Sequence, residues 1–170
     1  MIRDAQQCDI QALSELAMKT YSDAFGHSFS TSDLAAHLIR HLSPENFSRI
    51  LEEDVVLLAE VEDRLIGYVQ FGAAASLSSR SEDSELHRLY VLAECQNRGY
   101  GSALMDAALR HPRLSCAANI YLDVWEHNSG AQRFYRRYGF EVVGTRSFVV
   151  ESGAETSLDL IMVRCGAPKG

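Results

Sequence analysis

This chain of 170 residues lacks paired cysteines, long apolar runs and an excess of basic residues. Its four cysteines form no C-x-x-C pair and no zinc-ligand spacing, which excludes a disulfide scaffold and a metal site of that kind. The apolar stretches fall far short of the roughly 18 residues that a membrane span needs. We therefore expect a cytoplasmic chain with free thiols, no metal and no membrane partner.

Positive charge is also scarce, because 16 basic residues face 23 acidic ones and the net charge is −7. A protein that binds the nucleic-acid backbone needs a basic face, so we expect no nucleic-acid partner, while a cationic substrate stays open. The length, the 46% hydrophobic and the 23% charged composition are those of one globular domain. No repeat or linker divides the chain, and we expect residues 1–170 to form a single domain.

Helical patterns dominate the first third of the chain. Asp9 is a plausible N-cap for a helix that runs toward Tyr21, and a second helical pattern follows Thr31. Ser43 and Pro44 favour the end of that helix and the start of a third. Residues 55–73 are rich in β-branched and aromatic residues around a polar turn at 62–64, which predicts a hairpin.

Strands and helices alternate in the rest of the chain. We expect strands over residues 85–91, 119–124, 140–143 and 157–163, and helices over 103–109 and 129–138. Asn128 would cap the last helix and Gly139 would close it. The whole pattern indicates an α/β chain with a mixed sheet.

A glycine turn lies where the strand at 85–91 hands over to the next helix. Glycine lets the backbone approach a ligand closely, and the first amides of a helix suit a pyrophosphate. There is no G-K-[ST] for a Walker loop and no third glycine for a dinucleotide fingerprint. An isolated G-x-G would more often be a plain turn. The residues of this segment are Gln96, Asn97, Arg98, Gly99, Tyr100, Gly101 and Ser102.

The sequence resembles the GNAT superfamily of acyl-CoA-dependent N-acetyltransferases. The motif Q/R-x-x-G-x-G/A is matched at residues 96–101, and a second family block follows in order at Asn128, Ala131, Phe134, Tyr135, Gly139 and Phe140. Residues 20–25, 122–128, 134–140 and 159–162 are further similar to the PaiA-type polyamine acetyltransferases. Asp123 and His87 depart from what is usual in that branch. The resemblance implies a mostly antiparallel sheet with a splayed parallel strand pair, flanked by helices.

The resemblance implies where acetyl-CoA, the cosubstrate, would lie. The main chain of Leu89, Tyr90 and Val91 would bind the pantetheine arm as another strand would, and the turn at 96–102 would bind the pyrophosphate. Asn128 would hold the pantetheine region, although it could also be only a helix cap. The alternative for Leu89 and Val91 is an ordinary core strand, and both roles are compatible.

Tyr135 occupies the family position that donates a proton to the departing thiolate. A phenol with a pKa near ~10 and a thiol near ~8.5 are close enough for that transfer. Alternatively Tyr135 is a core aromatic residue, as we expect for Phe134 and Tyr138.

The acceptor amine must lose a proton before or during its attack on the thioester. Glu85 is the base we favour, through water, with Asp123 and Glu126 as the other candidates. Each could instead be a solvated surface carboxylate. His87 and His127 are possible proton carriers. No covalent enzyme intermediate is needed.

The leading hypothesis is acetyl transfer to a primary amine of a polyamine-type small molecule. Other acceptors stay open, namely a peptide or protein amine or an aminoglycoside. A regulatory module that binds acyl-CoA without turnover is the alternative from another class. A homodimer is possible by analogy only.

Overall fold

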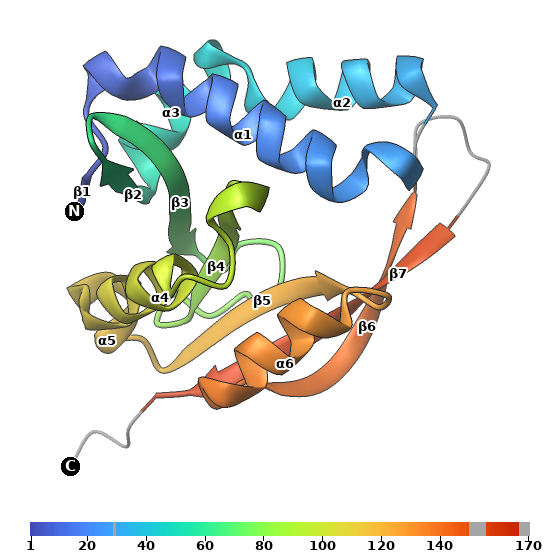
Figure 1. Cartoon of the computed structure of the whole chain (residues 1–170). Coiled ribbons are helices and arrows are strands. Elements are labelled where there is room, and N and C mark those ends of the chain that lie inside the picture. Colours follow the sequence, from blue (N-terminus) through green and yellow to red (C-terminus); the bar gives the residue numbers. More distant parts are fainter. Residues whose placement is uncertain (29, 150–155, 167–170) are drawn as a thin grey trace. The chain divides into compact units, whose positions relative to one another are not determined.

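The computed structural model of the chain describes residues 1–28, 30–149 and 156–166 (Figure 1). Its contacts divide the chain into two compact units. The first, called the N-terminal unit, comprises residues 1–71 and 88–111, and the second, the C-terminal unit, comprises residues 72–87 and 112–170. Each unit is described by itself.

The strands have the order β1-β2-β3-β4-β5-β7-β6. The β1–β2, β2–β3, β5–β7 and β6–β7 pairs are antiparallel, and the β4–β5 pair is parallel. The expected fold class, a mixed sheet with one parallel pair flanked by helices, is therefore confirmed.

The N-terminal unit contains most of the helices. They are α1 (Ile10–Phe25), α2 (Thr31–Leu42), α3 (Pro44–Glu53) and α4 (Tyr100–Arg110). Its strands are β1 (Ile2–Asp4), β2 (Val55–Val61), β3 (Arg64–Ala73) up to Phe71, and the end of β4 (Ser84–Val91) from Arg88. Short 3-10 turns lie at Gln7–Asp9, Gly26–Ser28 and Ala93–Cys95.

Serine caps set the boundaries of two of these helices. The Ser30 hydroxyl accepts the amide of Asp33 at 3.1 Å, and the Ser43 hydroxyl accepts the amide of Asn46 at 3.4 Å. Pro44 stands in the first turn of α3, where its missing N–H costs nothing. The expected start of α3 is thus confirmed.

Asp9 has a different role from the one its sequence predicts. It does precede α1, but its side chain makes no capping bond to that helix. Its carboxylate instead accepts the amide of Gln6 at 2.8 Å and pairs with Arg3 at 2.7 Å. Arg3 also reaches Glu60 at 2.7 Å. The Asp9 carboxylate therefore stabilises β1 through its ion pair with Arg3. The sequence did not predict this strand.

The predicted hairpin of β2 and β3 closes on Glu62 and Asp63. Both have positive φ, 49° and 61°, as the twist of a two-residue hairpin turn requires. Phe47 of α3 packs edge-on against Tyr68 of β3, with ring centroids 6.2 Å apart, and both are almost fully buried. The core of this unit also includes Leu13, Ala17, Leu58, Val69, Leu104 and Met105.

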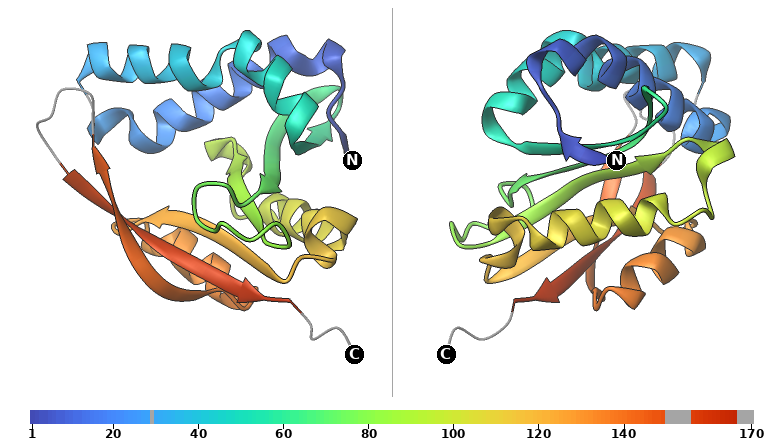
Figure 2. Two further views of the ribbon diagram at one scale, coloured as in Figure 1. Left: turned by 180° about the vertical axis from the view of Figure 1, so that it is seen from behind. Right: turned by 60° about the vertical axis from the view of Figure 1, so that its left-hand side comes forward.

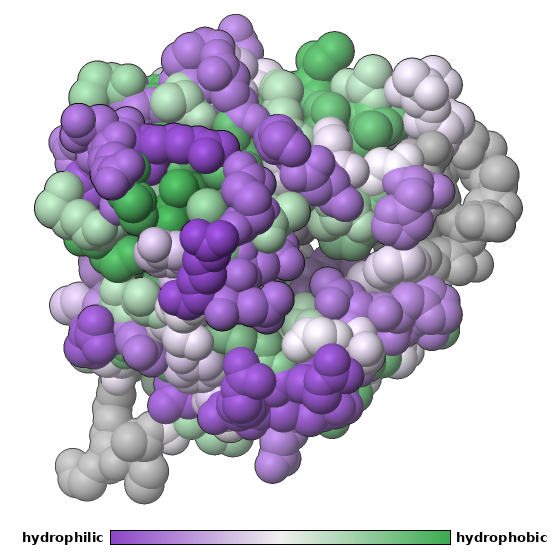
Figure 3. Space-filling view, in the orientation of Figure 1, coloured by the Kyte–Doolittle hydropathy of each residue, from purple (hydrophilic) through white to green (hydrophobic). Residues whose placement is uncertain are grey.

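Some apolar residues of helix α2 are buried and others are exposed. Leu42 is buried and Leu38 is half-buried, whereas Ala35, Ala36 and Ile39 are exposed. Figure 3 shows hydrophobic residues at the surface over this helix.

The C-terminal unit holds the start of β4, α5 (Pro112–Ser115), β5 (Asn119–Trp125), α6 (Ser129–Arg137), β6 (Glu141–Val149) and β7 (Thr156–Cys165). The parallel pairing of β4 with β5 joins Ser84 to Ile120 and Glu85 to Tyr121. Helix α6 lies beside the strands of this unit (Figures 1 and 2). Strands β6 and β7 are both longer than the sequence predicted.

None of the helices among the described residues has the length and apolar character needed to cross a membrane.

Candidate functional site

The glycine turn forms the start of α4 in the N-terminal unit. Gly99 is the residue before the helix and has φ +86°, a conformation that side chains rarely adopt. Asn97 shares this left-handed region with φ 59°. The amide of Ala103 bonds to the carbonyl of Gly99 at 2.9 Å, so the amides before Ala103 belong to the first turn, where a helix supplies no acceptor.

The turn suits an anionic group. Its residues Gln96 to Gly99 are all exposed, and nothing lies within 4 Å of the place where a Gly99 Cβ would stand. Amides and the positive end of a helix dipole attract phosphate, and Arg98 adds an exposed cation. Tyr100, Gly101 and Ser102, in the first turn of α4, are half-buried. These residues fit the pyrophosphate of coenzyme A.

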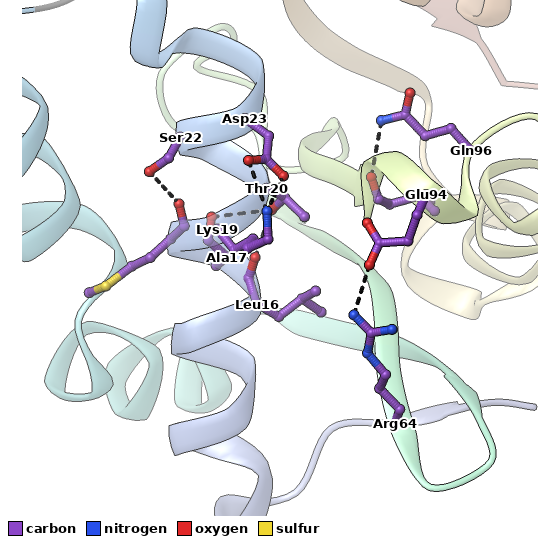
Figure 4. Close-up of polar contacts among 11 residues, drawn as sticks. Leu16, Ala17, Lys19, Thr20, Ser22, Asp23, Arg64, Glu94 and Gln96 are labelled. Carbon is purple, nitrogen blue, oxygen red and sulfur yellow. Dashed lines mark hydrogen bonds and ion pairs between the residues drawn. The ribbon is translucent and has the colours of Figure 1, made fainter.

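Two contacts order the segment that leads into the turn (Figure 4). Arg64 of β3 pairs with Glu94 at 2.8 Å, and the Gln96 side-chain amide donates to the carbonyl of Val91 at 3.1 Å. Gln96 is therefore bonded to the strand predicted to bind the pantetheine arm.

That part of β4 packs closely on β3. The Tyr90 ring stacks on Tyr68 with centroids 5.9 Å apart, and the amide of Leu92 donates to the carbonyl of Ile66 at 2.8 Å. Leu89, Tyr90 and Val91 are all half-buried, so their side chains pack in the unit. Their role toward a cofactor stays a prediction.

Glu85 is buried in the C-terminal unit, with 5% of its surface exposed. Its carboxylate accepts the Ser76 hydroxyl at 3.0 Å, and Nδ1 of His87 lies 3.3 Å from it. A solvated surface carboxylate, the alternative left open by the sequence, does not describe this residue. Its role as the base stays a prediction.

The other two carboxylate candidates have partners of their own. Asp123 forms an ion pair with Arg146 of β6. Glu126 accepts the amide of Leu158 at 3.3 Å and lies 3.7 Å from Nε2 of His127, an exposed histidine. The two carboxylates therefore differ in their partners, since Asp123 pairs with an arginine, whereas Glu85 accepts a hydroxyl and lies near a histidine.

Tyr135 is the buried aromatic residue of α6, with 8% exposed. Burial raises its pKa well above the ordinary range, and the charge of Asp123 adds to this. The phenol therefore keeps its proton at neutral pH, as a proton donor must. Phe134 and Tyr138 are only half-buried, which corrects the expectation that they are the core aromatics of this helix.

Asn128 caps α6, since its side-chain oxygen accepts the amide of Ala131 at 3.0 Å. The cap predicted from the sequence is therefore confirmed. Its amide nitrogen is not used in that bond, so a second role toward a cofactor is compatible with the cap.

Asp159 of β7 has a carboxyl with a raised pKa that the sequence did not predict. Burial, the nearby charge of Asp123 and, more weakly, that of Glu126 raise its pKa to about 6, although Arg146 opposes the shift. The register places Asp159 opposite both Trp125 and Arg146. No short-range pattern in the sequence could show this, because the neighbours lie on other strands.

The described residues contain no group of three His, Cys, Asp or Glu side chains arranged to hold a metal ion. The cysteines at positions 8, 95, 116 and 165 are free thiols.

The model of the acetyltransferase (GNAT) family matches residues 10–140. This chain belongs to the GNAT family. As a GNAT acetyltransferase it uses acetyl-CoA as cosubstrate and transfers the acetyl group to an amine.

Curated relatives share the activity class of this GNAT chain. It is 30% identical over 158 residues to an uncharacterized N-acetyltransferase of Mycobacterium tuberculosis, covering 92% of this chain and 97% of the relative. It is 30% identical over 144 residues to the peptidyl-lysine N-acetyltransferase YiaC of Escherichia coli, covering 84% of both. A spermine/spermidine N(1)-acetyltransferase of Bacillus subtilis is 28% identical over 90 residues, which cover 51% of this chain and 59% of the relative.

Among solved structures, the GNAT chain is similar to the PaiA N-acetyltransferase of Thermoplasma acidophilum in complex with coenzyme A. The TM-score is 0.79 at 22% identity, and the match covers 97% of this chain and 98% of the other. The likeness shows that the two share a fold.

Proposed function

We propose that this GNAT acetyltransferase acetylates a primary amine of a polyamine-type small molecule such as spermidine or spermine. The observation that carries the chemical part is the buried Glu85 carboxylate, held by the Ser76 hydroxyl at 3.0 Å. A buried, oriented carboxylate suits proton removal from an ammonium group. Bound acetyl-CoA supplies the activated acetyl thioester.

The residues of the chain would move two protons. Glu85 takes one from the acceptor ammonium through a water molecule, so that the amine attacks as the free base. Tyr135 gives its phenolic proton to the departing sulfur, and the amine nitrogen sheds its second proton to solvent. Exchange with solvent then removes the proton from Glu85 and returns one to Tyr135. The acetyl group then rests on the nitrogen and coenzyme A leaves as the thiol.

A polycationic acceptor is supported by charge and by similarity. The net charge is −7, and burial together with the nearby charges of Asp123 and Glu126 raises the pKa of Asp159, although Arg146 opposes the shift. A polyammonium ligand would relieve that repulsion. Similarity to the Bacillus spermine/spermidine enzyme points the same way.

A peptide or protein lysine is the second candidate. It is supported by the similarity to YiaC, which covers more of this chain than the similarity to the Bacillus enzyme does.

We extend the proposal to the domain organisation, the cellular compartment and the oligomeric state of the enzyme. We propose that both units form one acetyltransferase domain over residues 1–170, because the family match at 10–140 runs through both. Four free cysteines fit a reducing cytoplasm. A homodimer through β6 would cover Val142 and Val143, which are exposed on an outer strand of the sheet.

Thiol release from acetyl-CoA, followed across polyamines, lysine peptides and aminoglycosides, tests the acceptor. Turnover with spermidine or spermine is expected. Turnover with a peptide alone would replace the polyamine by the second candidate, and acetyl-CoA binding without any turnover would favour a regulatory module.

Two pairs of variants test the residues. Tyr135→Phe should lower kcat by about a hundredfold or more, since general acids contribute on that scale, whereas Tyr138→Phe, at the residue just after the same helix, should not. Glu85→Gln should lower kcat similarly, whereas Glu82→Gln, at an exposed position, should not. An unchanged kcat in Tyr135→Phe or Glu85→Gln would contradict the role of that residue.

A further inference from the structure

Arg146 of β6 is shared between two residues that lie far from it in the sequence. Its Nη2 forms the ion pair with Asp123 of β5, and its Nη1 lies 3.5 Å from the Ser76 hydroxyl. Ser76 in turn lies 3.0 and 3.3 Å from the two oxygens of Glu85. A continuous chain of contacts thus runs from Asp123 through Arg146 and Ser76 to Glu85.

The donors and acceptors in this series of contacts fix the direction of its hydrogen bonds. A guanidinium can only donate, so the Ser76 oxygen accepts from Arg146. The single hydroxyl proton of Ser76 is then left for Glu85, which as a carboxylate can only accept. Arg146 therefore selects the orientation of Ser76 that stabilises an ionised Glu85.

The ion pair with Asp123 fixes the guanidinium in place. Ser76 is an exposed loop residue, and without Arg146 its hydroxyl would be free to turn toward water. Arg146 also carries the positive charge of this chain of contacts, opposite the carboxylates of Asp123 and Glu85. Both effects hold the Ser76 hydroxyl toward the Glu85 carboxylate.

We propose that Arg146 is a positioning residue for acetyl transfer, which acts on Glu85 through Ser76. The inference rests on the proposed role of Glu85 as the base. It assigns to β6 a residue that orients the hydrogen bond to a carboxylate on β4, without contact with the substrate.

Other charged and titratable groups lie near Glu85 and define the controls. His87, on its own strand, lies 3.3 Å away, and Tyr121 stands beside it in the β4–β5 register. Asp123 and Arg146 complete the charged and titratable groups that the contacts link to it. Removal of Arg146 leaves His87 and Tyr121 in place.

The test compares pH profiles of kcat and KM, measured with saturating acetyl-CoA, for Arg146→Gln, Arg146→Lys and Ser76→Ala. Arg133→Gln is the matched control, because it removes one positive charge from an exposed position of the same unit. In Arg146→Gln the rising acidic limb of the kcat–pH profile should move to higher pH by about one unit. On that limb kcat should then be about tenfold lower at a given pH, since one pH unit is a factor of ten. KM for the amine should change less than about twofold, and Arg146→Lys should restore part of the shift.

The coupling through Ser76 gives a second measurement. Ser76→Ala should shift the limb in the same direction, and the Ser76→Ala/Arg146→Gln double variant should shift it no further than the larger single shift. Additive shifts, or a change confined to KM, would overturn the inference. So would an Arg146→Gln profile that matches Arg133→Gln.

Glu85→Gln distinguishes failure of the proposed base, Glu85, from failure of the proposed positioning residue, Arg146. If it leaves the profile and kcat unchanged, the proposed base itself is wrong. If it abolishes the limb while Arg146→Gln does nothing, only the role of Arg146 fails. Ser76→Ala keeps the test valid if Arg146→Gln does not fold, which thermal melts will show.

Discussion

Gly67 of β3 lies so close to Tyr90 of β4 that a Cβ on Gly67 would stand 2.8 Å from the Tyr90 carbonyl oxygen. The same Cβ would meet Val91 Cγ2 at 3.1 Å and Leu104 Cδ1 at 3.2 Å. Glycine is therefore required where β3 passes the stretch of β4 that we expect to bind the pantetheine arm.

Gly67→Ala should lower the free energy of unfolding by about 1–3 kcal/mol, the usual cost of overpacking, and should weaken coenzyme A binding. Urea denaturation and calorimetric titration measure the two effects. Gly130→Ala is the matched control, since its Cβ meets nothing closer than 3.7 Å and lies in a helix, where alanine stabilises. Equal stability of the two variants would contradict the close approach.

Gly99→Ala should act on backbone conformation alone. Space for the methyl group is open, but the φ of +86° strains alanine by about 1 kcal/mol. The turn should shift and the Kd for coenzyme A should rise. Gly99→Asn should be milder, because asparagine tolerates left-handed backbone better. Calorimetry of both variants checks this order, and a reversed order would argue against strain as the cause.

Asn128 offers a way to separate a cap from a ligand. Asn128→Ala should cost about 1 kcal/mol of stability through the lost cap of α6. Asn128→Asp keeps an oxygen for the Ala131 amide and places a negative charge at a helix N-terminus, so it should stay as stable as the parent. If the amide also holds the cofactor, both variants should raise KM for acetyl-CoA. An unchanged KM in Asn128→Asp would leave the cap as the sole role.

Asp159 predicts a pH dependence of stability. Its pKa is raised to about 6, so the native state binds this proton more tightly than the unfolded chain does. Its contribution to stability is thus fully present below about pH 4 and is lost as the pH rises through about 6. Asp159→Asn cannot ionise and should gain in Tm over the parent as the pH increases from about 4 to 8.

Thermal melts across that range measure the difference. Asp106→Asn, at an exposed position of α4, provides the baseline. Parallel curves for Asp159→Asn and the parent would show that this carboxyl does not titrate as described.

Local signals explain what the sequence predicted well. Ser43 with Pro44 marks the start of α3, Asn128 marks that of α6, and the polar turn at 62–64 marks the hairpin. In each case the deciding interactions lie within a few residues along the chain. The family motif likewise falls where the structure places the left-handed Gly99 at the start of α4.

Long-range pairing explains what was missed. Strand β1 is only three residues long and pairs with Leu57, Leu58 and Ala59 of β2. Its neighbours in the sequence therefore contain no pattern that predicts a strand. The surroundings of Asp159 are set by registers with β5 and β6. Ser76 stands in a stretch that reads as an ordinary polar loop, and its contact with Glu85 arises only in the folded unit.

The bond from the Gln96 side chain to the Val91 carbonyl has a consequence for any molecule that docks along β4 in the manner of an extra strand. One acceptor at the end of that edge is already occupied by the protein's own amide. The row of main-chain acceptors that β4 presents to an extended ligand therefore ends at Val91. An extended ligand would have to leave the strand at that residue.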